Sequence, residues 1–215
     1  MSKIVLRTYR TKKRRTKTMS KPIIILDNGH GMETPGKRSP IWSDRTQLLE
    51  YEFNRDVVRR IEAALNERGI ANVVLVPEWN DVSLTERVKR ANDITKGNKG
   101  GAILISVHAN AGGGTGWEVY TSPGQTKSDP LATILYNEAE KEFAPDGWKM
   151  RADHSDGDPD KESNFYILTK TSCPAMLSEN FFMDTEKDCR FIMSNEGRQR
   201  IANVHVRAIE KMLEA

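Results

Sequence analysis

The 215-residue sequence contains only two cysteines and no long hydrophobic run. Its most apolar stretches, residues 23–26 and 102–107, are as short as β-strands, whereas a membrane-spanning helix needs about 20 residues. Residues 4–6 are too few for the hydrophobic segment of a signal peptide. Cys173 and Cys189 allow at most one disulfide and cannot alone build a thiolate zinc module. We therefore expect no membrane span, no visible signal peptide and reduced cysteines.

The formal net charge is only +3, but the charges are distributed unevenly. Residues 1–21 hold nine Lys/Arg and no acidic residue, while the other 194 residues hold 24 Lys/Arg against 30 Asp/Glu. This pattern predicts a basic N-terminal arm over residues 1–21 and one folded domain over residues 22–215. The arm is either a solvated tail or an electrostatic attachment to an anionic polymer. The sequence pI of 8.8 therefore does not indicate a specific nucleic-acid partner.

Short apolar runs alternate with amphipathic segments along the domain. Such runs predict strands over residues 22–27, 72–76, 102–107, 116–121, 164–169 and 175–178. Helical spacing of apolar residues predicts helices over residues 45–69, 128–143 and 196–213, and one that begins after a cap at Asp81 or Ser83 and ends at about residue 96, with a polar loop over residues 146–163. Alternating strands and helices indicate an α/β fold, in which helices cover both faces of a sheet with parallel strands at its centre.

Three predicted strands are followed by side chains that can carry chemistry. His30 lies just after residues 22–27, His108 directly after residues 102–107, and Glu179 directly after residues 175–178. In α/β sheets, ligands bind at the carboxyl ends of the strands. Two of the four histidines and one glutamate are therefore expected at the same edge of the sheet.

Glu50 lies on the apolar face of the first predicted helix. At about 100° per residue, Val57 and Ile61 fall within about 20° of Glu50, whereas Glu52 falls about 200° away. A buried carboxylate is costly unless it is paired or binds a metal. Glu50 therefore either binds a metal beside the two histidines, or caps its helix or pairs with Arg45.

Two histidines and one glutamate that leave one position open form a ligand set typical of catalytic zinc. Zinc can lower the pKa of a water molecule to ~7, and hydrolysis then needs a nearby carboxylate to transfer protons. Glu179 is the candidate for that role. The alternative is that Glu179 faces solvent or pairs with a surface lysine.

Four segments carry recognisable motifs, in the order 23–31 (IIILDNGHG), 50–54 (EYEFN), 105–120 (ISVHANAGGGTGWEVY) and 174–183 (PAMLSENFFM). Together they resemble the zinc-dependent N-acetylmuramoyl-L-alanine amidases of the amidase type 3 family, which includes autolysins and phage endolysins. The resemblance extends over about residues 22–213. The sequence departs from the family pattern at Asn28, Ser178, Asn180 and in residues 32–45, but none of these departures removes a ligand.

The resemblance implies a single three-layer α/β/α domain around a mixed, mostly parallel sheet, with residues 22–215 as the zinc amidase catalytic domain. It implies one Zn²⁺ per chain, held by His30, Glu50 and His108, with Glu179 as the catalytic glutamate. The implied reaction is hydrolysis of the amide between N-acetylmuramic acid and L-alanine in peptidoglycan. Such an enzyme acts on the cell wall, in the periplasm or outside the cell.

Two other functions stay open at this point. One is a zinc peptidase that cuts within the stem peptide of peptidoglycan, and the other is a non-catalytic, zinc-stabilised module that binds the wall or nucleic acid. A structural zinc usually has four protein ligands, so three ligands and a base favour an enzyme. We expect a monomer that binds peptidoglycan or a muropeptide, with the basic arm contacting an anionic wall polymer.

Overall fold

The computed structural model describes residues 20–215, so the predicted basic arm lies outside the described residues apart from Ser20 and Lys21. The strands are β1 (Ile23–Asn28), β2 (Asn72–Val74), β3 (Ala102–Asn110), β4 (Trp117–Thr121), β5 (Lys161–Glu162) and β6 (Ala175–Phe182). The helices are α1 (Glu50–Glu67), α2 (Leu84–Gly97), α3 (Asp129–Phe143), the short 3-10 helix η1 (Ala144–Asp146), α4 (Tyr166–Lys170), α5 (Glu186–Met193) and α6 (Asn195–Met212).

The six strands form one mixed sheet in the order β2-β1-β3-β6-β4-β5. The pairs β1–β2, β1–β3, β3–β6 and β4–β5 are parallel, and only β4–β6 is antiparallel. Parallel pairing of β1, β3 and β6 brings the carboxyl ends of these three strands to one edge of the sheet. The α/β expectation with a mostly parallel sheet is confirmed.

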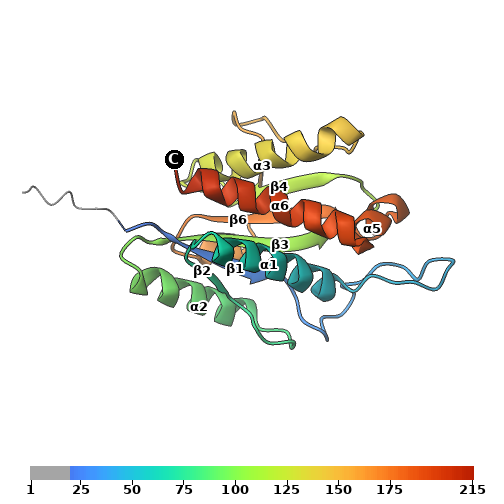
Figure 1. Cartoon of the computed structure of the whole chain (residues 1–215), viewed down its shortest axis with the longest axis horizontal. Coiled ribbons are helices and arrows are strands. Elements are labelled where there is room, and N and C mark those ends of the chain that lie inside the picture. The colour runs from blue at the N-terminus through green and yellow to red at the C-terminus, as the bar shows by residue number, and fades with distance from the viewer. Residues whose placement is uncertain (1–19) are drawn as a thin grey trace, which may run out of the picture.

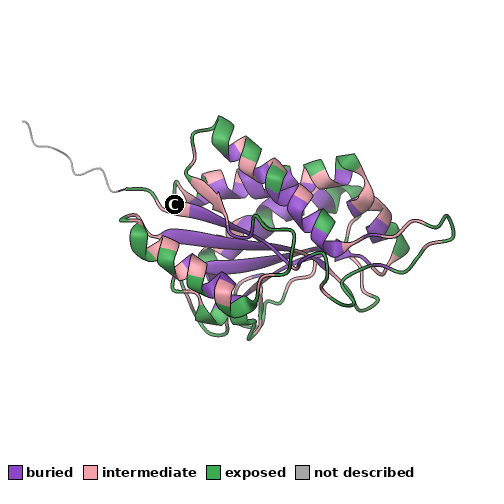
Figure 2. Ribbon diagram, turned by 90° about the horizontal axis from the view of Figure 1, so that it is seen from below, coloured by how far each residue is buried: buried purple, intermediate pink, exposed green. Residues whose placement is uncertain are grey.

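Helices cover both faces of the sheet, as the three-layer expectation requires. Helices α1, α6 and α3 lie side by side across one face, with α6 in the middle (Figure 1). Helices α2 and α4 cover the other face, where a second, smaller apolar core lies. The strands between these layers are almost entirely buried (Figure 2).

The alternation of side chains along each strand decides which residues face which core. In β3, Ile103, Ile105 and Val107 enter the core beneath α1 and α6, while Ala102 and Leu104 enter the core beneath α2 and α4. Side chains alternate between the two faces with period two along β1, β3 and β6. Residues an even number of positions beyond those in the second core therefore also face α2 and α4. These residues are Asp27, Ser106, His108 and Glu179.

Two predicted elements differ from the structure. The helix expected over residues 45–69 begins only at Glu50, because Asp44 accepts hydrogen bonds from the Thr46 backbone and hydroxyl and thereby holds a turn before it. The strand expected over residues 164–169 is wrong, since this segment leads into helix α4. Ile167 and Leu168 are buried in the second core from a helix rather than from a strand, an ambiguity inherent in short apolar runs.

The sequence patterns did not predict two further elements. Helix α5 was not predicted, and β5 is a two-residue strand within the expected polar loop. None of the helices in residues 20–215 combines the length and hydrophobicity needed to cross a lipid bilayer.

Candidate metal centre

The three side chains predicted as metal ligands meet at the carboxyl edge of the sheet. His30 follows β1, Glu50 is the first residue of α1, and His108 lies near the end of β3. Glu50 Oε1 lies 3.3 Å from His30 Nε2 and 3.1 Å from His108 Nδ1. One donor atom from each residue lies within 4.8 Å of the other two, so a single ion can contact all three.

The chemistry of this triad fits a divalent cation. Glu50 is only 1% exposed, and its Oε2 atom has no hydrogen-bond partner among the described residues. Burial raises the pKa of Glu50, but hydrogen bonds from His108 and His30 outweigh it and hold that pKa well below its usual range. A buried, ionised carboxylate between two imidazole nitrogens is a suitable donor set for zinc.

Glu50 is held from two directions. The Asn54 amide group, one turn along α1, donates to the Gly29 carbonyl at 3.0 Å and to Glu50 Oε1 at 3.4 Å. The backbone N–H of Ala109 donates to the same carboxylate oxygen at 3.3 Å. Glu52, the alternative acidic residue, is exposed, as the helical periodicity predicts.

A hydrogen-bonded chain orients the His108 ring. The Ser106 hydroxyl donates to Asp27 Oδ2 at 2.5 Å, so its oxygen is left to accept from His108 Nε2 at 3.2 Å. With a metal ion bound, a proton on Nε2 leaves the lone pair of Nδ1 free to face that ion. Asp27 therefore acts on His108 through Ser106.

The backbone turns sharply at His30, which has a positive φ of 61°. Two buried arginines hold its carbonyl oxygen, with Arg55 Nη1 at 3.0 Å and Arg87 Nη2 at 3.1 Å. The neighbouring glycines provide space: a Cβ at Gly29 would collide with the His108 ring, and one at Gly31 with the backbone of Asp81. His30 itself, rather than a glycine, makes the left-handed turn.

A family model described as N-acetylmuramoyl-L-alanine amidase matches residues 24–211, nearly the whole described chain. The chain belongs to this amidase family. The match includes both histidines, Glu50 and Glu179.

Individual relatives agree with the family match. The chain is 28% identical over 191 residues to the sporulation-specific N-acetylmuramoyl-L-alanine amidase of Bacillus subtilis, covering 87% of this chain and 67% of that protein. It is 30% identical over 192 residues to the amidase CwlM of Bacillus licheniformis, with the same coverage. The crystal structure of an N-acetylmuramoyl-L-alanine amidase from Clostridium difficile 630 superposes with a TM-score of 0.76 at 22% identity, covering 91% of this chain and 98% of that one, and shows the same fold.

In this amidase, Glu179 lies on β6 in register with His108 on β3. Its Oε2 atom is buried without a hydrogen-bond partner among the described residues. Burial, together with the negative charges of Glu50 and Glu118, raises the pKa of Glu179 to about 8, although His108 and Lys37 act to lower it. A carboxyl group with a pKa near neutrality is suited to accept and return a proton.

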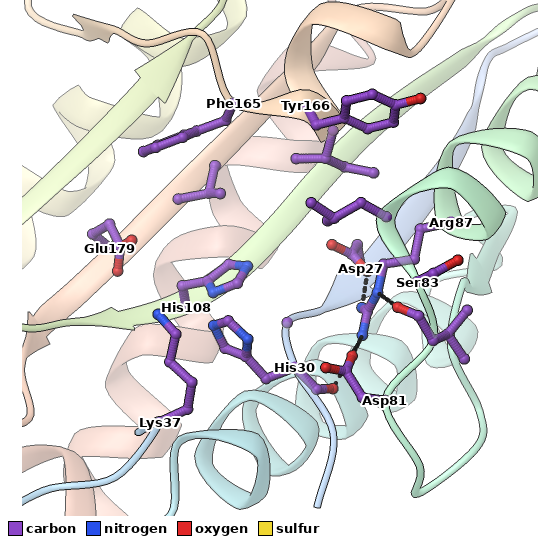
Figure 3. Close-up of a pocket in the computed structure, with 15 residues that line it drawn as sticks. Asp27, His30, Lys37, Asp81, Ser83, Arg87, His108, Phe165, Tyr166 and Glu179 are labelled. Carbon is purple, nitrogen blue, oxygen red and sulfur yellow. Dashed lines mark hydrogen bonds and ion pairs between the residues drawn. The ribbon is translucent and has the colours of Figure 1, made fainter. Parts of the chain in front are cut away.

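A cavity of about 370 Å³ opens beside the amidase triad, between α2 and α4 (Figure 3). One end is lined by His30, His108, Glu179 and Lys37. The other end is lined by apolar residues that include Leu84, Phe165, Tyr166 and Ile167. The polar end therefore holds the chemistry, and the apolar end provides contact area for a ligand.

Several residues around the site were not singled out by the sequence. Arg55 and Arg87 carry no motif signal, because an arginine in an amphipathic helix is ordinarily a surface residue. Asn180 was noted only as a departure from the family pattern, yet its amide donates to the His108 carbonyl at 2.9 Å and its oxygen accepts from the Trp117 ring at 2.8 Å.

The two other histidines lie outside the candidate centre. His205 is fully buried in α6, where its Nε2 atom lies 2.9 Å from the Ser178 hydroxyl, so it is a packing residue. His154 is exposed in the polar loop.

Proposed function

We propose that the chain hydrolyses the amide between the lactyl group of N-acetylmuramic acid and the L-alanine of the stem peptide, with one Zn²⁺ held by His30, Glu50 and His108. The observation that carries this proposal is the meeting of these three donors beside Glu179, at the wall of a cavity in a member of the amidase family. Relatives from Bacillus subtilis and Bacillus licheniformis are N-acetylmuramoyl-L-alanine amidases, which supports the same substrate bond.

The protein supplies position and proton transfer. When bound, zinc supplies Lewis-acid chemistry, drawing electron density from oxygen and making a water molecule more acidic. Glu179 accepts a proton from the attacking water at a carboxylate oxygen and then donates it to the nitrogen that leaves as the L-alanine amine. The Asp27–Ser106 pair keeps the proton of His108 on Nε2, so that Nδ1 stays available as a ligand.

The substrate places this activity at the cell wall, because peptidoglycan is the wall polymer. We propose that residues 22–215 form the catalytic domain and act as a monomer, since this stretch by itself supplies the three ligand candidates and Glu179. Residues 1–21 then form a separate basic arm that contacts an anionic wall polymer.

Product analysis of digested, purified peptidoglycan tests the proposal. We expect free muramic lactyl groups and new L-alanine amines in equal amounts, identified by mass spectrometry. A metal chelator should abolish their release, and added zinc should restore it, because the metal supplies the Lewis acid that makes the attacking water more acidic.

Two outcomes would reject the proposal in different ways. Cleavage within the stem peptide, with muramoyl-L-alanine left intact, would identify a zinc peptidase instead. No bond cleavage by zinc-loaded protein, combined with binding to the wall, would identify a non-catalytic module. The Glu52→Gln variant serves as a control for altered helix charge, because Glu52 is exposed on the opposite face of α1 and should leave cleavage unchanged.

A further inference from the structure

The segment between β1 and α1 carries a lysine into the site. At Lys37 the segment is fixed to the start of α1, because the Lys37 carbonyl accepts the N–H of Glu50 at 3.0 Å. Two hydrogen bonds between Ser39 and Leu48 fix the segment a second time. The Ser39 N–H donates to the Leu48 carbonyl at 2.9 Å, and the Leu48 N–H donates to the Ser39 hydroxyl at 2.8 Å. The position of Lys37 is thereby coupled to that of the metal-ligand candidate Glu50.

The Lys37 side chain points into the catalytic end of the cavity. Figure 3 shows its ammonium group extending toward His108 and Glu179. Its positive charge lowers the pKa of both Glu179 and His30, as expected for a cation near both groups.

Lys37 has no carboxylate partner within ion-pair distance among residues 20–215, and residues 1–19 contain no Asp or Glu. Arg55, the other cation near the site without an ion pair in the described part of the chain, is occupied by the backbone carbonyls of His30 and Glu78. Three further cations are neutralised by carboxylates. Arg87 pairs with Asp27 at 2.6 Å and with Asp81 at 3.2 Å. Arg151 and Lys161 both pair with the buried Glu118 at 2.6 Å. An unpaired ammonium group beside the catalytic carboxylate is therefore available to a ligand.

Amide hydrolysis creates a negative charge at a defined place. Attack of water on the carbonyl carbon shifts the electron pair of the C=O bond onto its oxygen, and a donor aimed at that oxygen stabilises the transition state more than the ground state. We propose that the Lys37 ammonium group donates a hydrogen bond to the scissile carbonyl oxygen as its negative charge develops. This inference rests on the proposed amidase function and assigns that reaction a further catalytic residue.

A second role for Lys37 would be to anchor a carboxylate elsewhere on the substrate. Its direction argues against this role, because the side chain approaches Glu179 and His108, between which the reacting carbonyl has to lie. A carboxylate further along the stem peptide would be held away from the reacting bond. The two roles also affect different kinetic constants: loss of an oxyanion donor lowers kcat, whereas loss of an anchor raises KM.

The test compares zinc-loaded wild-type protein with Lys37→Met, Lys37→Arg and Arg38→Met. Arg38 is the matched control, since it is the next residue on the same segment, is exposed and does not line the cavity. The substrates are N-acetylmuramoyl-L-alanyl-D-glutamate and its D-isoglutamine counterpart, which lacks the free α-carboxylate.

We expect Lys37→Met to lower kcat about 10²-fold on both substrates, with KM changed less than threefold, as for loss of one oxyanion donor. The kcat of Lys37→Arg should be at least tenfold higher than that of Lys37→Met, and the kcat of Arg38→Met should match that of wild type. A phosphinate analogue, which has a tetrahedral anionic group in place of the scissile carbonyl, should bind Lys37→Met about 10²-fold more weakly by calorimetry. Zinc content and thermal stability should be unchanged.

An unchanged kcat or an unchanged phosphinate affinity would overturn the inference. A rise in KM confined to the substrate with the free α-carboxylate would also overturn it, and would make Lys37 an anchor. Loss of zinc from Lys37→Met would overturn it too, by assigning the lysine to the metal site. These results differ from failure of the proposed function, in which wild-type protein would cleave neither substrate.

Discussion

At the scale of single residues, the unusual group is Glu179. Its carboxylate is partly buried near the acidic side chains of Glu50 and Glu118, and its pKa is raised to about 8, mainly by burial. The same burial leaves its Oε2 without a protein partner. A buried carboxylate oxygen without a partner is costly for stability, so its position is explained by function rather than by packing.

Replacing Glu179 by glutamine keeps the shape of the side chain but removes its ability to carry a proton. We expect the variant to bind zinc with wild-type stoichiometry, because the three ligand candidates are untouched. Its turnover of muropeptide should fall about 10²- to 10⁴-fold, the range for loss of a general base. Turnover within a factor of three of wild type would show that Glu179 is not the base.

The same variant has a second readout in the metal-free protein. The pKa of Glu179 is about 8 in the folded state and about 4.5 in the unfolded chain. Wild-type protein therefore loses stability as pH rises from about 4.5 to about 8, since only the unfolded state ionises readily, whereas Glu179→Gln does not titrate. Glu179→Gln should match wild type in Tm at pH 4 and exceed it at pH 9. Equal Tm values at pH 9 would contradict the raised pKa.

At the scale of elements, the turn after β1 is held by α1 and α2. Arg55 on α1 is only 4% exposed, and its guanidinium donates to the His30 carbonyl at 3.0 Å and to the Glu78 carbonyl at 2.8 Å. Arg87 on α2 reaches the same His30 carbonyl from the opposite side. Two helices from different layers thus fix the backbone of one candidate ligand.

Replacing Arg55 by methionine keeps apolar bulk but removes these donors. We expect zinc affinity to fall about 10- to 100-fold, because groups that orient a metal ligand contribute on that scale. Competition with a chromogenic chelator measures the affinity directly, without an activity assay. Arg59→Met is the control: Arg59 is exposed on the next turn of α1, where it stacks on Trp79. Equal zinc affinities for the two variants would contradict a positioning role for Arg55.

The sequence predicted those elements whose pattern is local. Buried strands such as residues 102–107 and the apolar stripe around Glu50 follow from periods of two and 3.6 residues, which need no knowledge of neighbours. The segment at residues 164–170 could not be assigned this way, because its five helical residues are too few to show a period. Its helical form depends on contacts with α2, made by residues far away in the sequence.

At the scale of the molecule, parallel pairing of β1, β3 and β6 explains why the site was largely predictable. Once these strands are neighbours, His30, His108 and Glu179 must lie at one edge. The cavity beside them was not predictable, because its walls come from the start of α2, from α4 and from the segment with Lys37. The packing of these segments depends on tertiary contacts that no short motif encodes.

The uneven distribution of charge along the chain is also a property of the whole molecule. Residues 1–21 carry nine positive side chains and no negative one, while residues 22–215 carry six more acidic than basic side chains. The family match begins at residue 24, so the basic residues lie outside the part of the chain that carries the amidase motifs. Catalysis on a small soluble substrate should therefore not depend on them.

Deletion of residues 1–18 removes eight of the nine basic side chains and tests the proposed arm. We expect kcat/KM on a soluble muropeptide to stay within twofold of the full chain. Sedimentation with purified walls that carry an anionic polymer should show about tenfold weaker binding at 20 mM salt and no difference at 0.5 M, where charges are screened beyond a few ångströms. Walls stripped of that polymer are the control, because both forms should bind them equally. Equal binding to intact walls at low salt would contradict electrostatic attachment through the arm.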